Sequence, residues 1–440
     1  MPRLPFEVEI TRIIPGGRGL AFHEGRPLFA AGVVPGDRLQ IHSFRDRKSY
    51  LEASGFVVAD PSPDRREAPC PYYGKCGGCD FQHMTEERQL LAKKEILLDA
   101  LARIGQIRPD PGTIRLVSSP PWHYRNRLQI KIGQVEGNSN WGYFQTSSHE
   151  IIAVDQCRIA REPLWNWMLE LRDLLKSRPE IVRSLTGMEV MEGDRGQFMV
   201  ELETGEQEEQ AGGLAGQLKA LLAVFCEPDA SINLRNEQGR RWQLAGPGFL
   251  EKSVEGKKYR VSHGAFFQIN DLLLCSLREV ATSGYRGRKA LDLFCGGGFF
   301  TLALADSFEE VVAVEVNAAA VADLRAVLET TKVSNCRVVA IELESYFRRV
   351  DSRDLKADLV LLDPPRSGLP KDAVEKVAAL GTKDVVYVSC DPATLARDLR
   401  IFLGRDYRID SLTLLDLFPQ THHLETVARL KRFDSPGADL

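Results

Sequence analysis

The sequence predicts an α/β protein with a C-terminal doubly wound, Rossmann-like sheet, preceded by a small N-terminal β-barrel and a mixed α+β central segment. Three observations predict this class. From about residue 264, short and nearly continuous apolar runs alternate with helical patterns, as parallel strands covered on both faces require. The first 58 residues instead alternate over short segments separated by Gly and Pro turns. The residues between these regions mix both patterns and contain a group of cysteines.

Size and composition limit the classes of protein to which this chain can belong. A chain of 440 residues can form roughly two to four domains with a large core. A hydrophobic content of 43% and a charged content of 27% are typical of soluble globular proteins. No apolar run approaches membrane length, and MPRLPFEVEI has no signal-peptide core, so we expect a cytoplasmic location. Nine cysteines in such a protein are not expected to form disulfides, so clustered ones indicate metal binding or catalysis.

Charge is distributed unevenly along the chain. The net charge of −4 excludes a strongly cationic protein. Residues 1–50 nevertheless hold eight Lys or Arg against five Asp or Glu, and residues 108–135 hold five against one. Acid concentrates elsewhere, as in ELETGEQEEQ at 201–210. A local basic face is therefore compatible with the sequence.

Three domains follow from these patterns. Residues 1–60 are interpreted as the barrel, of the oligonucleotide-binding kind, because FEVEITRI, PGGRGLAF and GRPLFAAGVVPGDRLQIHSF supply strands and turns. ADPSPDRREAP, at 59–69, is interpreted as a linker. The central domain then covers 61–263 and the doubly wound domain 264–440.

The central region predicts a few elements. A helix is expected from Thr85, with Leu90, Leu97, Leu101 and Ile104 at helical spacing. RLQIKIG and HEIIAVD are expected strands, and a second helix is expected near 164–176.

The run PWHYRNRLQIK, at 121–131, interleaves aromatic and basic side chains. These are Trp122, Tyr124, Arg125, Arg127 and Lys131. The pattern suits phosphate contact and base stacking, or equally a strand with a solvated cationic edge.

The sequence PCPYYGKCGGCDF predicts a ligand site. It places Cys70, Cys76 and Cys79 within ten residues, with glycines between them to bend the backbone. Cys157 is the candidate fourth ligand because it is the next cysteine along the chain. Zinc and a [4Fe–4S] cluster both accept four thiolates, although the five-residue spacing is long for a zinc knuckle. Redox-active cysteines are a third and poorer interpretation.

KALDLFCGGGFFTLALA predicts a strand, a glycine turn and a helix. Gly296 and Gly298 allow a ligand to approach the backbone closely, but Thr301 stands where a dinucleotide fingerprint has its last glycine. Glu315 ends the next strand, nineteen residues after Gly296, which suits a carboxylate that binds a ribose diol. These features favour an adenosine cofactor without a pyrophosphate loop, with S-adenosylmethionine (SAM) as the leading candidate.

Two further strands end in chemically useful residues. Asp363 ends ADLVLLD, and two prolines stiffen the following turn, which could line a planar pocket or be an ordinary turn. Cys390 directly follows DVVYVS, and Asp391 and Pro392 then begin a helix. A helix amino terminus favours a thiolate, so Cys390 is a candidate nucleophile, against the alternative of a small core residue.

Taken together, these parts resemble the RNA uracil-5-methyltransferase family, which uses SAM to make 5-methyluridine. The resemblance covers nearly the whole chain. Two kinds of feature carry it. The first is the N-terminal barrel, which is TRAM-like. The second is a set of motifs, namely C-x5-C-G-G-C, FFQIN, LDLFCGGGFF, LLDPPRSGL, VYVSCDPATLARD and HHLETVARL. The barrel together with the cysteine group most resembles the branch that acts on 23S ribosomal RNA, with transfer RNA as the second choice of substrate and a monomer as the expected state.

The resemblance implies the following site residues. A [4Fe–4S] cluster would bind to Cys70, Cys76, Cys79 and Cys157. SAM would contact Gln268, Phe294, Glu315 and Asp363 in a class I methyltransferase domain. Cys390 would be the nucleophile, and Glu425 the carboxylate that removes a proton. Phe299 and Glu342 stand where some members have Asn, so neither is included.

These residue types match the chemistry that the family implies. Uracil C5 becomes nucleophilic only after a thiolate adds to C6, and a base must then remove the C5 proton. Glu425 lies in an otherwise strand-like stretch, unlike a typical surface Glu. Cys226, Cys275, Cys295 and Cys336 are expected to be small core residues, and His422 and His423 receive no role.

Three rival functions remain open at this point. A radical-SAM methylthiotransferase would need C-x3-C-x2-C and an iron free to bind SAM. An amino-group methyltransferase would need no cysteine nucleophile. A non-catalytic iron–sulfur RNA-binding protein would need neither Cys390 nor Glu425.

Overall fold

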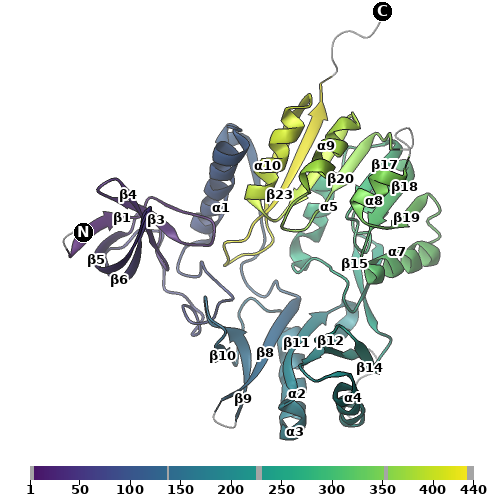
Figure 1. Cartoon of the computed structure of the whole chain (residues 1–440), viewed down its shortest axis with the longest axis horizontal. Coiled ribbons are helices and arrows are strands. Elements are labelled where there is room, and N and C mark those ends of the chain that lie inside the picture. The colour runs from purple at the N-terminus through teal and green to yellow at the C-terminus, as the bar shows by residue number, and fades with distance from the viewer. Residues whose placement is uncertain (1–3, 136–137, 224–229, 351–354, 434–440) are drawn as a thin grey trace, which may run out of the picture.

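The computed structural model describes residues 4–135, 138–223, 230–350 and 355–433. These residues form three large sheets and a two-stranded hairpin. In Figure 1 the N-terminal sheet lies at the left, the central sheet lies below, and the C-terminal sheet lies at the upper right. Among the described residues, no helix combines the length and the apolar character needed to cross a membrane.

The N-terminal sheet has six strands in the order β1-β5-β6-β4-β3-β2. They are β1 (Phe6–Glu9), β2 (Arg12–Ile13), β3 (Gly19–His23), β4 (Arg26–Ala30), β5 (Arg38–Arg47) and β6 (Tyr50–Asp60). Alternate apolar side chains, including Leu28, Leu39, Ile41 and Leu51, are fully buried in its own small core. The last strand reaches Asp60, so the first two residues of the predicted linker are part of the sheet.

The central sheet has seven strands in the order β10-β9-β8-β11-β12-β13-β14. They are β8 (Arg127–Val135), β9 (Asn138–Phe144), β10 (Ile151–Ala153), β11 (Leu185–Glu192), β12 (Phe198–Thr204), β13 (Ala230–Asn236) and β14 (Arg241–Ala245). Helices α2 (Glu162–Lys176), α3 (Pro179–Val182) and α4 (Glu208–Leu222) contribute apolar residues to its core. The predicted strand RLQIKIG and the helix near 164–176 are confirmed, whereas only three residues of HEIIAVD are in a strand.

The C-terminal sheet has eight strands in the order β19-β18-β17-β20-β21-β23-β22-β7. They are β17 (Gly287–Leu293), β18 (Phe308–Glu315), β19 (Cys336–Ala340), β20 (Leu359–Leu362), β21 (Asp384–Ser389), β22 (Tyr407–Asp416), β23 (Glu425–Arg432) and β7 (Ile114–Ser118). The four predicted apolar runs are the inner strands β17, β18, β20 and β21. They are mutually parallel, and the strand order reverses at β17, where α/β sheets bind ligands.

Helices cover both faces of this sheet, which explains why its strands are apolar throughout. They are α5 (Leu274–Thr282), α6 (Thr301–Leu304), α7 (Ala318–Thr331), α8 (Leu343–Arg349), α9 (Lys371–Ala379) and α10 (Pro392–Leu403). Leu291 and Leu293 of β17 belong to the core shared with α8, α9 and α10, while Ala290 belongs to the core shared with α5 and α7. The hairpin of β15 (Phe249–Val254) and β16 (Lys257–Ser262) packs against α7.

Part of the predicted central domain belongs to the C-terminal sheet. Strand β7 pairs with β22 in parallel, and α1 (Glu86–Ala100) packs against α10 and stands between it and the N-terminal sheet (Figure 1). Thr85 caps α1 as predicted, since its side chain accepts a hydrogen bond from the backbone of Arg88. The limits of this sheet therefore differ from the predicted boundary at residue 264. The sequence could not place β7, because its partner strand lies about 300 residues away in the chain.

Candidate active site and cysteine cavity

The predicted nucleophile and the predicted base lie on neighbouring strands. Cys390 follows directly after β21, and Glu425 is the first residue of β23. The two strands are antiparallel, and Ser389 pairs with Thr426. The next position along this register brings Cys390 opposite Glu425. This closeness also has an electrostatic effect. Burial is the main cause that raises the pKa of Cys390, and the charge of Glu425 raises it further.

The helix after Cys390 begins as predicted, but it does not ionise the thiol. The carboxylate of Asp391 accepts hydrogen bonds from the backbone nitrogens of Ala393, at 3.0 Å, and Thr394, at 2.8 Å. Burial and the charge of Glu425 nevertheless raise the pKa of Cys390 to about 11. Burial and Glu425 therefore oppose the thiolate that the helix terminus was expected to favour.

Arg366, which the sequence did not identify, supplies the opposing charge. It lies in the turn after β20, and its charge and a side-chain hydrogen bond lower the pKa of Cys390. Its charge also lowers the pKa of Glu425. Its Nη2 lies 3.3 Å from Nδ1 of His423. The available signal was its place three residues after Asp363, in a turn already predicted to line the site.

Two carboxyl groups near the thiol prefer to hold a proton. Glu425 is 4% exposed, and burial followed by the charge of Asp363 raises its pKa well above the usual range. Burial followed by the charges of Asp292 and Glu315 raises the pKa of Asp363 to about 7. A raised pKa makes the ionised carboxylate a stronger base, which suits a group that removes a proton.

The glycine turn after β17 has the backbone geometry that glycine allows. Gly296 and Gly298 have φ values of +53° and +87°, and a Cβ on Gly298 would overlap Leu324 of α7. Phe294 also has a positive φ, of +64°, although it is not glycine. Such conformations are costly for side-chain-bearing residues and gather at functional sites. The turn is therefore strained at Phe294 and fixed in shape at Gly298.

Glu315 lies beside this turn and binds it directly. Its carboxylate accepts hydrogen bonds from the backbone nitrogens of Gly296, at 2.9 Å, Val316, at 2.8 Å, and Asn317, at 2.7 Å. The predicted closeness of Glu315 and the glycine turn is thus observed. Its contact with a ribose stays a prediction.

Gln268 lies in the loop that joins β16 to α5. Its side chain is largely buried, at 8% exposure, and its backbone oxygen accepts a hydrogen bond of 3.2 Å from Asn126. Asn270, two residues on, is fully buried and donates to the backbone oxygen of Leu417, at 3.1 Å. These bonds hold the loop against both the central sheet and the segment that precedes Glu425.

The predicted RNA-contact run 121–131 is only partly available to a ligand. Tyr124 is buried, and its hydroxyl donates to the backbone oxygen of Pro419, so its ring cannot stack on a base. Arg127 pairs with Glu189 at 2.6 Å. Lys131 likewise pairs with Glu203, at 3.3 Å. Base stacking by Tyr124 is therefore excluded, and the ion pairs of Arg127 and Lys131 are compatible with the alternative of a strand with a cationic edge.

A groove of about 800 Å³ leads to Cys390. Three parts of the chain line it. They are the N-terminal sheet, with Arg12, Phe22 and Phe29; α1 and the turn after it, with Ile96, Asp99 and Arg103; and the catalytic loops, with Arg366, Cys390, His422 and His423. The groove therefore joins the N-terminal sheet to the candidate nucleophile, which only the tertiary structure could show.

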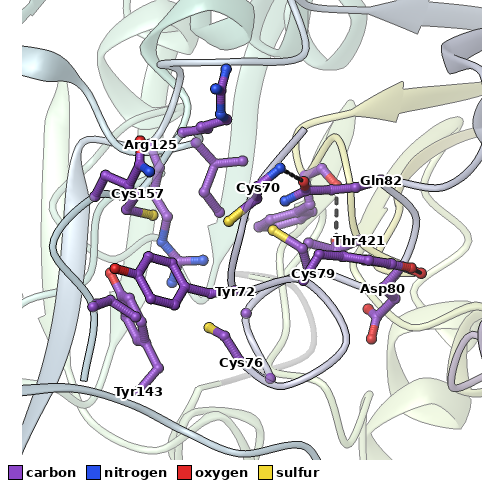
Figure 2. A pocket seen from close by; sticks show the side chains of 18 of the residues that line it. Cys70, Tyr72, Cys76, Cys79, Asp80, Gln82, Arg125, Tyr143, Cys157 and Thr421 are labelled. Atoms are coloured by element: carbon purple, nitrogen blue, oxygen red, sulfur yellow. Dashed lines mark hydrogen bonds between the residues drawn. The ribbon is translucent and has the colours of Figure 1, made fainter. Parts of the chain in front are cut away.

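The four predicted cysteine ligands gather around a second cavity, of about 270 Å³. Figure 2 shows the sulfur atoms of Cys70, Cys76, Cys79 and Cys157 pointing toward one hollow. Cys157 comes from the loop after β10, far from the others in sequence. Within the described ranges, no three His, Cys, Asp or Glu side chains are close enough together to hold a single metal ion. The structure thus brings the four predicted residues to the wall of one cavity.

The environment of these thiols is unfavourable for charge. Burial raises the pKa of Cys76 to about 11 and that of Cys79 to about 12, and the other cysteines add to the shift. Burial also raises the pKa of Cys157. Four thiols confined to one hollow would need a positively charged centre to ionise together.

The remaining cysteines divide between the core and the surface. Cys295 is buried as predicted, and Cys336 is partly buried in β19. Cys275 is exposed on α5, so the prediction that it is a core residue is wrong, because it faces away from the apolar side of that helix. Cys226 lies outside the described residues.

Comparison with known proteins gives a consistent picture. Residues 85–433 match the family described as tRNA (uracil-5-)-methyltransferase. A 23S rRNA (uracil(1939)-C(5))-methyltransferase of Alkalilimnicola ehrlichii is 33% identical to this chain, covering 98% of each protein. A protein of Aquifex aeolicus described as an uncharacterized RNA methyltransferase is 31% identical, covering 97% of this chain and 98% of its own.

One solved structure resembles the whole molecule. The tRNA (uracil-54, C5)-methyltransferase of Pyrococcus abyssi, in complex with S-adenosyl-L-homocysteine, superposes with a TM-score of 0.73. It covers 97% of this chain and all of its own, at 24% sequence identity. At that identity the likeness establishes the shared α/β fold.

Proposed function

This chain belongs to the tRNA (uracil-5-)-methyltransferase family and is an RNA uracil-5-methyltransferase, and on that premise we propose that it methylates C5 of a uridine in 23S ribosomal RNA through a covalent cysteine adduct. The single observation that carries the adduct is the juxtaposition of Cys390 and Glu425 across β21 and β23. Arg366 beside the same thiol adds the charge that an ionised sulfur needs.

The proposed steps use these three side chains in sequence. Cys390, as a thiolate, adds to C6 of the uracil, and the electron pair of the C5=C6 bond moves through the ring to the C4 carbonyl oxygen. SAM, when bound, supplies the methyl group that C5 then takes, and S-adenosylhomocysteine is released. Glu425 removes the remaining proton from C5, and the re-formed C5=C6 bond expels the sulfur. Because Cys390 is neutral in the free protein, the substrate and Arg366 must favour its ionisation in the complex.

The carboxyl groups around the glycine turn support a cationic cofactor. Burial, and then the charge of Glu315, raises the pKa of Asp292. Burial, and then the charges of Asp292 and Glu315, raises the pKa of Asp363, so acidic groups are concentrated at the carboxyl ends of β17, β18 and β20. The positive sulfonium of SAM would be attracted there. Glu315 and Asp363, with the loop residues Phe294 and Gln268, are the proposed contacts. The closely approachable backbone at Gly296 fits an adenosine.

The cysteine cavity supports a [4Fe–4S] cluster. Zinc would draw four sulfurs to about 2.3 Å from one ion. A hollow of about 270 Å³ lined by four thiols suits a larger, polynuclear centre with a thiolate on each iron. With all four positions filled by Cys70, Cys76, Cys79 and Cys157, we assign the centre a role in organising the fold around the RNA site.

The groove beside Cys390 supports RNA as the substrate. Its wall from the N-terminal sheet presents Arg12, and exposed Phe22 is available for stacking on an unpaired base. This sheet is the proposed TRAM domain. A uridine stacked in a helix could not reach Cys390, so the target would be unpaired or flipped out. The relatives named for 23S rRNA favour ribosomal RNA, and the likeness to a tRNA enzyme makes tRNA the second candidate.

A trapping experiment tests the proposal. The protein is incubated with SAM and transcripts of 23S rRNA or tRNA that contain 5-fluorouridine, and covalent complexes are resolved on a denaturing gel. Fluorine cannot leave C5 as a proton does, so the wild type should form a stable adduct, and with the rRNA transcript in preference. Cys390→Ala should form none, whereas the exposed-cysteine control Cys275→Ala should match the wild type.

A second variant separates catalysis from mere RNA binding. Glu425→Gln should accumulate a methylated protein–RNA adduct with ordinary uridine, because the C5 proton cannot be removed. Methylation of C5 by Cys390→Ala would overturn the proposed mechanism. An absence of methylation in the wild type with either RNA, together with tight RNA binding, would favour the non-catalytic alternative.

A further inference from the structure

One short segment separates the cysteine cavity from the catalytic groove. The partition segment, residues 418–423, follows β22 and leads into Glu425. Phe418, Thr421, His422 and His423 line the cysteine cavity, and both histidines also line the groove that contains Cys390. Nothing in the proposed chemistry uses either histidine, so their place on both cavities needs another explanation.

On the cysteine side, the partition segment is bonded to the residue after Cys79. The carboxylate of Asp80 accepts hydrogen bonds from Nδ1 of His422, at 2.7 Å, and from its backbone nitrogen, at 3.2 Å. The backbone nitrogens of Asp80 and Phe81 both donate to the backbone oxygen of Gln420, at 2.9 and 3.0 Å. The cysteine loop and the partition segment are thus tied by four hydrogen bonds.

On the catalytic side, the partition segment reaches Arg366. Nη2 of Arg366 lies 3.3 Å from Nδ1 of His423, which is oriented to accept its hydrogen bond. The rings of His422 and His423 are in contact, with centroids 4.2 Å apart. Arg366 lines the same groove as Cys390, and its charge lowers the pKa of that thiol. A continuous series of contacts therefore runs from the cysteine loop to the nucleophile.

Hydrogen bonds from α1 also hold the partition segment, so it has little freedom to adjust locally. Gln89 of α1 exchanges two 3.0 Å hydrogen bonds with Gln420, one to its backbone nitrogen and one to its side chain. Lys93, which is fully buried, donates to the backbone oxygen of Phe418 at 2.9 Å. A segment that is fixed at both ends and also by α1 transmits a displacement of one end to the other instead of absorbing it.

We propose that His422 and His423 are positioning residues that couple the cysteine loop to the catalytic arginine: Asp80 holds His422, and His423 holds Arg366 against Cys390. The inference rests on the proposed cysteine-adduct function and adds residues to it. It implies that the geometry of the nucleophile depends on the intact loop around Cys79.

Variants at His423 test the catalytic end. His423→Ala removes the acceptor for Arg366, while His423→Asn keeps an oxygen near the position of Nδ1. Single-turnover adduct formation with 5-fluorouridine RNA should fall about 10- to 100-fold in His423→Ala, as loss of a charge-assisted hydrogen bond predicts. His423→Asn should recover most of the rate. Equal rates for His423→Ala and the wild type would overturn the proposal.

A double-substitution cycle tests the coupling itself. Asp80→Ala should slow adduct formation about tenfold, and it should add little in the His423→Ala background, because both break the same series of contacts. Asp80→Asn, which retains an acceptor oxygen, should stay close to the wild type. Independent, multiplicative effects of Asp80→Ala and His423→Ala would show that the two ends are not coupled.

A structural measurement distinguishes a local change in the partition segment from a general loss of folding. Hydrogen exchange in the peptide that contains residues 417–424 should accelerate in Asp80→Ala and not in Asp80→Asn, while exchange in β17 and β18 is unchanged. Accelerated exchange everywhere, or none in the partition segment, would overturn the proposal. Failure of the wild type to trap any RNA is a different result, since it would contradict the proposed function itself.

Discussion

At the scale of single residues, the candidate nucleophile is surrounded by groups that act on its ionisation in opposite directions. Burial, Glu425 and Asp363 raise the pKa of Cys390, and Arg366 lowers it. The result is a pKa of about 11, so the thiol is protonated in the free protein. A resting thiol that ionises only when substrate arrives is protected from oxidation between turnovers, because oxidation follows thiolate character.

The first prediction concerns this balance. Replacing Arg366 by Ala removes the cation that favours the thiolate, so the pKa of Cys390 should rise further. Alkylation of Cys390 by iodoacetamide should grow about tenfold per pH unit below that pKa in both proteins, and at pH 8 it should be slower in Arg366→Ala. Mass spectrometry of the Cys390 peptide measures the rate separately from the other cysteines.

Arg400→Ala is the matched control for this measurement. Arg400 is exposed on the last turn of α10, one helix length away from Cys390, and it should leave the alkylation profile unchanged. Faster alkylation in Arg366→Ala would mean that Arg366 shields the thiol instead of favouring its ionisation.

At the scale of elements, the site depends on two features of the C-terminal sheet. The reversal of strand order at β17 opens the crevice beside the glycine turn, and the insertion of β23 between β21 and β22 brings Glu425 to Cys390. The glycine turn is rigid because α7 packs closely on Gly298. A change at this glycine should therefore act on the whole strand–turn–helix unit.

The second prediction tests that rigidity. Gly298→Ala combines a left-handed backbone, at φ +87°, with overlap against Leu324, so the free energy of unfolding should fall by about 1–3 kcal/mol. Urea denaturation measures the loss. Gly297→Ala is the neighbouring control, since a Cβ there would meet its nearest atom, the Arg260 oxygen, at an ordinary 3.6 Å. Similar destabilisation by both substitutions would contradict the packing argument.

At the scale of the whole molecule, the cysteine cavity joins parts of the chain that are otherwise separate. Cys70, Cys76 and Cys79 lie in the loop between β6 and α1, and Cys157 lies after β10 of the central sheet. A centre bound to all four would act as a crosslink between the region beside the N-terminal sheet and the central sheet. The same loop is hydrogen-bonded to the partition segment, so the cavity lies between the central sheet and the segment that joins β22 to β23.

The third prediction follows from that crosslink. Cys157→Ser should remove or weaken the visible absorption of anaerobically purified protein, and the free energy of unfolding should fall by about 2–4 kcal/mol, as for loss of a long-loop crosslink. Spectra and thermal unfolding of the two proteins measure both effects. The exposed Cys275→Ser should preserve the spectrum and the stability. An unchanged spectrum in Cys157→Ser would exclude Cys157 as a ligand.

Much of this architecture could be predicted from local pattern. The apolar runs gave β17, β18, β20 and β21, and Thr85 and Asp391 correctly marked helix starts. Periodicity and capping are local properties, so a single sequence reveals them. The errors were of a different kind. Tyr124 was a candidate for base stacking, but its ring is buried and its hydroxyl donates a hydrogen bond to the backbone oxygen of Pro419.

The sequence by itself determined that Cys390 would end a strand beside a helix amino terminus, and that three cysteines would form one loop. Only the tertiary structure placed Cys157 with that loop, Arg366 beside the thiol, and the partition segment between two cavities. The physical reason is the distance along the chain over which each kind of interaction acts. Strand and helix signals act over a few residues, whereas solvation, strand neighbours and charge pairs depend on segments that meet only when the chain has folded.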